Sequence, residues 1–236
     1  MNNYTKGRIS ELAKHDLCGY IFKSKSPSCG TGRVNVYSEF GSTKVRYGPG
    51  LFASAFIKTL PLIPVEDEGR LHDPGIKENF IIRVFCFYRL GRLLREKFSI
   101  GKLVKFHTKH KFLLLSHSRK HYDTMGQLVA NAKASRLEEL KTRYSNLFME
   151  ALTYKSTPKK NTDVLLHMMG FLKKILTRSE KEDILATIED YRKELLPLIV
   201  PVTLIRHQAN KYNVEYLLDQ IYLNPHPKEL MLRNHV

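Results

Sequence analysis

The sequence has little of what would mark a membrane protein or a disulfide-stabilised scaffold. It contains no tryptophan, only three cysteines, and no uncharged apolar run of about 18 residues, the length that a membrane-spanning helix needs. Its first residues also lack the charged-then-apolar layout of a secretory signal. An apolar share of 42% suffices for ordinary cores. We therefore expect a globular protein of the reducing cytoplasm.

Acidic residues are scarce in one part of the chain. Residues 81–122 contain eleven Lys and Arg but one acidic residue, whereas the ratios are eleven to eight before this segment and seventeen to fourteen after it. A concentrated basic segment favours an RNA partner over a merely solvated surface, with anionic lipid as a weaker alternative. The residues expected to contact RNA are Arg92, Arg95, Lys102, Lys105, His107, Lys109, His110, Lys111, Arg119 and Lys120.

Hydrophobic periodicity predicts a change of architecture near residue 85. Before it we expect a short helix, two strand-like runs at "GYIFKS" and "RVNVYSEFG", a helix at "LFASAFIKTL" and a loop at "PLIPVEDEGRLHD". After it we expect only helices, at 78–98, 101–116, 119–133, 135–154, 162–177, 180–195 and 202–222, with Ser118 and Ser179 as N-caps. The prediction is an α/β N-terminal part with an incomplete open sheet (1–85), a connecting basic helix (86–100) and an all-α domain (101–236).

A polar loop, "KSKSPSCG", follows the first expected strand. In open α/β sheets ligands gather beyond the carboxyl ends of strands, so the loop lies where a site would be. Its serines supply hydroxyl groups, and Cys29 supplies a thiol. The thiol is either a ligand or nucleophile, or a small apolar filler of a turn, which is the commoner role of a single cysteine. No second cysteine lies close enough to form a C-x-x-C pair, so the loop alone does not indicate a zinc or cluster site.

Longer motifs resemble two known families. "GYIFKSKSPSCG", followed by "RVNVY", "GPGLFA" and "LPLIPVEDEGRLHDP", resembles the later part of the TudS-like thiouracil desulfidase family. "FHTKHKFLLLSHSRKHYDTMGQLVA", "LLHMMGFLKK" and "YLLDQIYLNPHPKELMLRNHV" are similar to the YbgA-like domain. Their order resembles the RudS-like tRNA 4-thiouridine desulfidases. Together the two resemblances cover nearly the whole chain.

The resemblance implies a chemistry and a set of roles. Such desulfidases remove sulfur from a thiolated pyrimidine without redox change, at a 4Fe-4S cluster that three cysteines hold and that leaves one iron open to the substrate sulfur. By motif position Cys29 matches the third cluster ligand. Ser26 matches a serine beside the substrate and is our candidate catalytic residue.

The family's other two cluster cysteines and a catalytic glutamate belong to a segment that precedes the equivalent of Met1. Cys18 and Cys86 do not replace them, since Cys86 is expected to be a buried helical thiol. We therefore expect one of three cases: a truncated chain, a partner polypeptide that supplies the cluster segment, or a protein that keeps only an RNA-binding role. The chain alone is expected to be inactive.

Histidines accompany the basic segment. His107 and His110, like His117 and His121, are spaced to share a helix face, which would suit a metal, but no carboxylate or thiol completes a set nearby. A role in an RNA-binding surface is the favoured interpretation. His167, in "LLHMMGFLKK", is expected to be a satisfied core histidine.

Overall fold

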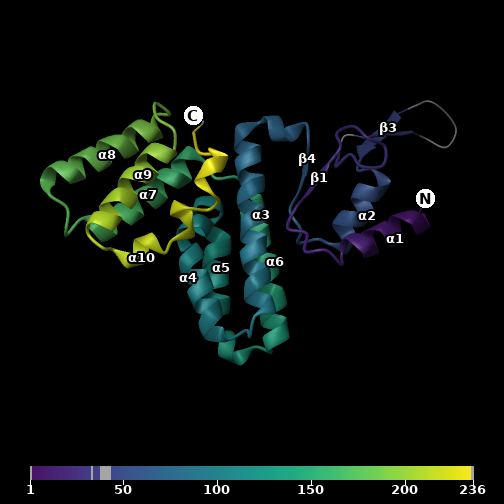
Figure 1. Ribbon diagram of the computed structural model, residues 1–236, viewed down its shortest axis with the longest axis horizontal. Helices are drawn as coiled ribbons and strands as arrows, with labels where there is room; N and C mark the ends of the chain where they lie inside the picture. Colours follow the sequence, from purple (N-terminus) through teal and green to yellow (C-terminus); the bar gives the residue numbers. More distant parts are fainter. Residues whose placement is uncertain (1, 33, 38–43, 235–236) are drawn as a thin grey trace. The chain divides into compact units, whose positions relative to one another are not determined.

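The computed structural model describes residues 2–32, 34–37 and 44–234 (Figure 1). The chain divides into two compact units, Met1–Tyr88 and Arg89–Val236, which are described separately below. The first is α/β and the second is all-helical, as the sequence predicts. None of the helices within the described ranges combines the length and the apolar character needed to cross a bilayer.

The first unit contains two small sheets. Its elements are α1 (Asn2–Leu12), β1 (Tyr20–Phe22), β2 (Val34–Tyr37), β3 (Lys44–Gly48), α2 (Leu51–Thr59), β4 (Val65–Asp67), a 3-10 turn η1 (Arg70–His72) and the first part of α3 (Pro74–Arg95). Strand β1 pairs in parallel with β4, and β2 pairs antiparallel with β3.

Aromatic side chains fill the core of this unit. Phe22 of β1 and Phe56 of α2 are almost fully buried and meet edge to face with their centroids 5.6 Å apart. Tyr20 and Phe52 pack beside them, and Ile9 of α1 closes the cluster. Because α2 and β1 share this core, the loop that follows β1 is held against the start of α2.

Strand β4 corrects one prediction. Residues 61–73 were expected to form a loop, yet Val65, Glu66 and Asp67 pair with Tyr20, Ile21 and Phe22. Acidic residues have low strand propensity, and three residues are too few to show an alternating pattern. The pairing with β1, which local sequence does not encode, determines this strand.

The second unit is built from the rest of α3 and a set of packed helices. They are α4 (Ile100–His117), α5 (Arg119–Ala130), α6 (Leu137–Thr153), α7 (Pro158–Leu172), α8 (Arg178–Arg192), α9 (Ile199–Lys211) and α10 (Glu215–Leu218), with short 3-10 turns at 132–134, η3 (Ile221–Leu223) and 228–230. Helix α4 packs against α5, α6 and α7, while α7, α8 and α9 pack against one another (Figure 1).

Two helix boundaries differ from the prediction. The cap of α8 is Thr177 rather than Ser179: its hydroxyl accepts from the Glu180 N–H, and the Glu180 carboxylate accepts from the Thr177 N–H. The single helix expected at 202–222 is divided into α9 and α10, because Asn213 has a left-handed backbone with φ of 53°. The Ser118 cap of α5 is confirmed.

Candidate functional site

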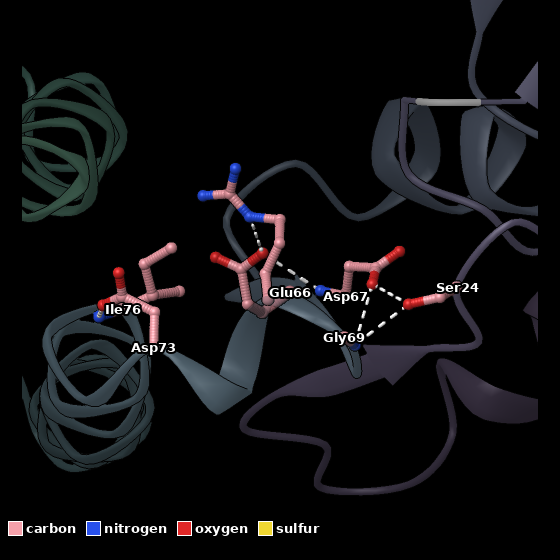
Figure 2. A network of polar contacts seen from close by, with 7 residues as sticks. Ser24, Glu66, Asp67, Gly69, Asp73 and Ile76 are labelled. Atoms are coloured by element: carbon pink, nitrogen blue, oxygen red, sulfur yellow. Dashed lines mark hydrogen bonds and ion pairs between the residues drawn. The ribbon is translucent and has the colours of Figure 1, made fainter.

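A polar network lies at the carboxyl ends of β1 and β4. Ser24, just after β1, donates a hydrogen bond to Asp67 at the end of β4, and the Gly69 N–H donates to both the Ser24 hydroxyl and the Asp67 carboxylate at 2.9 Å (Figure 2). The Ser24 N–H donates to Glu68 at 3.2 Å. A Cβ on Gly69 would lie 2.6 Å from the Ser24 oxygen, so only glycine permits this approach. The network fixes the loop between strand β1 and Cys29.

A cavity of about 540 Å³ opens beside this network. Its lining combines the loop residues Ser24, Lys25, Thr31 and Gly32 with Glu66, Asp67, Gly69 and Arg70 of the β4 side. Glu66 accepts a hydrogen bond from Arg70 at 2.7 Å, and both residues line the cavity. The expected position of a site, beyond the ends of parallel strands, is thus a polar hollow.

Cys29 lies in a tightly hydrogen-bonded turn. Its N–H donates to the Ser26 hydroxyl at 3.3 Å, and its sulfur lies 3.3 Å from the Ser28 hydroxyl. The Ser28 carbonyl accepts from Phe52 and Ala53, two of the N–H groups that α2 leaves unsatisfied at its first turn. The Ser28 hydroxyl is therefore placed to donate to a Cys29 thiolate, while the backbone of the same residue caps α2.

A second cavity, of about 320 Å³, exposes the Cys29 thiol. It is lined by Tyr4, Thr5 and Arg8 of α1, Tyr20 of β1, Ser28, Cys29, and Leu51 and Phe52 of α2. Aromatic faces next to a thiol and a guanidinium suit a flat, polar ring, and this volume lies at the lower end of the range for small-molecule sites.

Gly50 allows the Ser28–Cys29 turn to pack closely against the start of α2, and its substitution tests the importance of this contact. An alanine Cβ there would lie 2.4 Å from the Ser28 carbonyl and 2.8 Å from the Cys29 nitrogen, so the turn would have to move. We expect Gly50→Ala to lower the free energy of unfolding by about 1–3 kcal/mol, as overpacking does, and to increase the rate of Cys29 alkylation. Urea unfolding and peptide mapping measure the two effects.

The matched control is Gly7→Ala in α1. No atom of the described residues lies within 4 Å of the added Cβ there, and alanine stabilises a helix interior relative to glycine by about 1 kcal/mol. Equal unfolding and alkylation for the two variants would contradict the role assigned to Gly50.

Ser26, the candidate catalytic residue, points into the turn. Its hydroxyl contacts the Ser28 hydroxyl at 3.2 Å and the Cys29 N–H, and it is not among the residues that line either cavity. Ser28 instead lines the second cavity together with Cys29. The sequence prediction chose Ser26 among the serines of the loop and missed Tyr4 and Arg8; the alternating serines gave no signal of which one faces outward.

The residues around Cys29 do not by themselves fit the cluster that the resemblance implies. Across residues 2–32, 34–37 and 44–234, no three His, Cys, Asp or Glu side chains are grouped to hold a metal ion. Cys86 is fully buried in α3, as expected, and Cys18 is not among the residues lining either cavity. Cys29 is thus one thiol without a described set of co-ligands.

Exposed cations follow one face of α4 in the second unit. Lys102, Lys105 and Lys109 are spaced by three and four residues and are all exposed, and they are called the α4 stripe below. Lys102 lies 3.6 Å from Glu96, and Lys109 lies 3.2 Å from Asp219. Of the other cations expected to contact RNA, Arg92, Arg95, Arg119 and Lys120 are exposed and Lys111 is half-buried.

The histidines expected on this surface are buried, so that part of the prediction is wrong. His107 is 8% exposed and His110 2% exposed. His107 stacks on Tyr122 and contacts the Tyr144 hydroxyl at 3.2 Å, while His110 donates to the Phe106 carbonyl at 2.7 Å. They lie on the face of α4 that packs inward. His117 and His121 are likewise buried.

The prediction for His167 is also wrong, because this residue is exposed rather than buried. It was expected in the core, but it is exposed on α7 and its ring stacks on Phe171. Desolvation lowers its pKa, with further contributions from Lys111 and Arg119. Leu166, beside it, is also exposed, whereas Leu165, Met168 and Met169 are buried, so His167 lies on the outer face of a helix whose opposite face is apolar and buried.

Comparison with known proteins finds similarity in both parts of the chain. Residues 1–68 match the model of the family "2-thiouracil desulfurase", and residues 111–227 match a family described as "Protein of unknown function (DUF1722)". The "Uncharacterized protein YbgA" of Escherichia coli K12 is 27% identical over 158 residues, which cover 66% of this chain and 94% of YbgA. No solved structure matches. The chain is thus similar to the 2-thiouracil desulfurase family in its first part and to the DUF1722 family and YbgA in its second, an arrangement that indicates a desulfidase-related function.

Proposed function

We propose that this chain forms part of a desulfidase that removes sulfur from a thiolated pyrimidine, 4-thiouridine, in tRNA. The observation that carries the proposal is the cavity where Cys29, Ser28 and Arg8 meet the rings of Tyr4, Tyr20 and Phe52. A pyrimidine ring stacks on aromatic faces, and Arg8 can donate to its carbonyl oxygen. The exposed cations of the second unit supply the attraction for the tRNA backbone.

The proposal assigns Cys29 one ligand position of a 4Fe-4S cluster. Because the described residues offer no group of co-ligands, the other two thiolates have to come from polypeptide other than these residues, and the resemblance places the catalytic glutamate in the same segment as those thiolates. Within the chain itself, Ser28 holds the thiolate by a hydrogen bond, Ser26 orders the turn, and the aromatic rings position the base.

A complementation experiment tests this function. The chain is combined anaerobically with the cluster-bearing N-terminal segment of a complete desulfurase, and loss of 4-thiouridine from tRNA is measured together with bound iron. We expect both to appear with the wild-type chain, and Cys29→Ala to reduce each at least about tenfold, as loss of an essential ligand does. Cys18→Ala, a half-buried cysteine of the same unit, is the matched control.

An RNA-binding protein without desulfidase activity is the second candidate, and the lack of co-ligands around Cys29 within the described residues favours it. In that case Cys29→Ala changes neither iron content nor tRNA, while wild-type chain still binds tRNA with a steep dependence on salt. Equal turnover by Cys29→Ala and wild type would instead exclude the role of Cys29.

A further inference from the structure

Three aromatic rings form a stacked row on the second unit, separate from the residues around Cys29. His167 and Phe171 of α7 stack with their centroids 5.9 Å apart and 24° between their planes. Phe171 and Tyr216 of α10 stack at 4.9 Å and 28°. His167 is exposed, Phe171 is 41% exposed and Tyr216 is half-buried. We call these three residues the aromatic row.

A buried phenylalanine ring packs against all three residues of the aromatic row. Phe112 of α4 is fully buried, and it meets His167, Phe171 and Tyr216 edge-on, at interplanar angles of 89°, 90° and 73°. Edge-to-face contact is a favourable aromatic geometry, and it fixes rings that an isolated surface residue would leave mobile. The row is thus pre-organised, while His167 and Phe171 remain exposed to solvent.

Positively charged side chains lie close to the row. The Lys111 ammonium lies 5.3 Å from the Phe112 centroid and 6.0 Å from the Phe171 centroid, and desolvation lowers its pKa. The charges that act on His167 are those of Lys111 and Arg119, both positive. Lys120 follows Arg119 at the exposed start of α5. The surroundings suit a phosphate next to a flat ring.

We propose that the aromatic row is a stacking platform for an unpaired base of RNA, whose flanking phosphates contact Lys111 and Arg119. This inference rests on the RNA partner of the proposed function and adds the part of the RNA that is recognised. A base inside a duplex cannot expose its face to a protein ring, whereas a loop or single-stranded base can. Stacking on aromatic side chains tolerates any base, because each has a π-face.

The test uses the full chain and a single-stranded RNA that contains one 2-aminopurine, whose fluorescence falls when it stacks. A duplex of the same length is the second ligand. We expect the wild-type chain to quench the single strand, and Phe171→Ala to weaken its binding about tenfold and abolish the quenching. Duplex affinity should change less than about twofold, since phosphate contacts remain.

Three further variants separate stacking from loss of packing. Phe171→Leu keeps an apolar side chain but removes the ring, and it should behave like Phe171→Ala. Phe171→Tyr restores a ring and should restore quenching. Leu185→Ala on α8 removes a side chain of similar exposure, 44% against 41%, and should have no effect.

Each outcome decides between the two proposals. If Phe171→Leu binds and quenches the single strand like wild type, the platform is excluded while the RNA partner stands. Equal weakening of single strand and duplex by Phe171→Leu also excludes it, because the row would then act on backbone contacts alone. If the wild-type chain binds neither RNA at low salt, the RNA partner itself is excluded, and the row belongs to a protein interface.

Discussion

Changing Lys102, Lys105 and Lys109 to Glu is expected to lower the affinity for tRNA on the order of a hundredfold at low salt. Each phosphate contact contributes about 0.9 to the slope of log affinity against log salt for a duplex, so the magnitude of the slope should fall by roughly two to three. The three side chains are exposed, and the nearby Glu96 and Asp219 are 51% and 64% exposed, so solvent screens the new like-charge contacts and the fold should persist.

The control reverses the same amount of charge elsewhere. Lys133, Lys159 and Lys228 are exposed and lie outside the α4 stripe, and their joint replacement by Glu changes the net charge equally. Filter binding or anisotropy at several salt concentrations compares the two triple variants. Equal losses would show that affinity depends on net charge alone, and the α4 stripe would then have no specific role.

Acid is expected to destabilise the second unit well above the pH at which carboxylates titrate. Burial lowers the pKa of His110 from 6.5 to about 3 and that of His107 to about 4. His110 donates through Nδ1 to the Phe106 carbonyl, and its Nε2 is buried without a hydrogen-bond partner among the residues that the structure describes. A proton added at Nε2 would bring an unsatisfied charge into the core.

The direction of the effect follows from proton uptake. Above pH 6.5 both imidazoles are neutral in the folded and the unfolded chain. Below it the unfolded chain binds two protons that the folded chain does not, so the free energy of unfolding falls by about 1.4 kcal/mol per pH unit for each histidine. At pH 5 the two together should cost on the order of 4 kcal/mol relative to pH 7.5.

Urea unfolding at pH 7.5 and pH 5 measures this loss. His110→Leu removes one titrating group, and it should recover about half of the difference between the two pH values. His207→Leu, which replaces an exposed histidine of α9, controls for the substitution itself. If His110→Leu shows the wild-type difference, the buried imidazoles are not the source of the acid sensitivity.

The helices could be predicted from sequence because each has an apolar face with a period of 3.6 residues. The same pattern predicts that His107 and His110 are buried, since both share a helix face with Leu103 and Phe106. They were nevertheless expected on the RNA-binding surface, because they lie in the basic segment of the sequence. Net charge describes a segment, whereas burial is decided by the helix face.

The site was predictable in position but not in composition. The loop after β1 and the Cys29 turn follow from the motif, whereas Asp67 and Glu68 reach the loop only because β4 pairs in parallel with β1. Tyr4 and Arg8 reach Cys29 from α1 through tertiary packing. Contacts of this kind depend on long-range pairing, and residue order along the chain does not reveal them.

Helix α3 limits where either module can be excised. Phe80 and Ile82 are buried in the first unit and Leu90 and Leu93 in the second, although all four lie on one unbroken helix of 22 residues. The family matches end at residue 68 and begin at residue 111. A chimera joined at either residue would lack buried apolar residues of α3 that belong to the transferred unit. Grafting of the YbgA-like domain onto another enzyme therefore has to carry α3 with it.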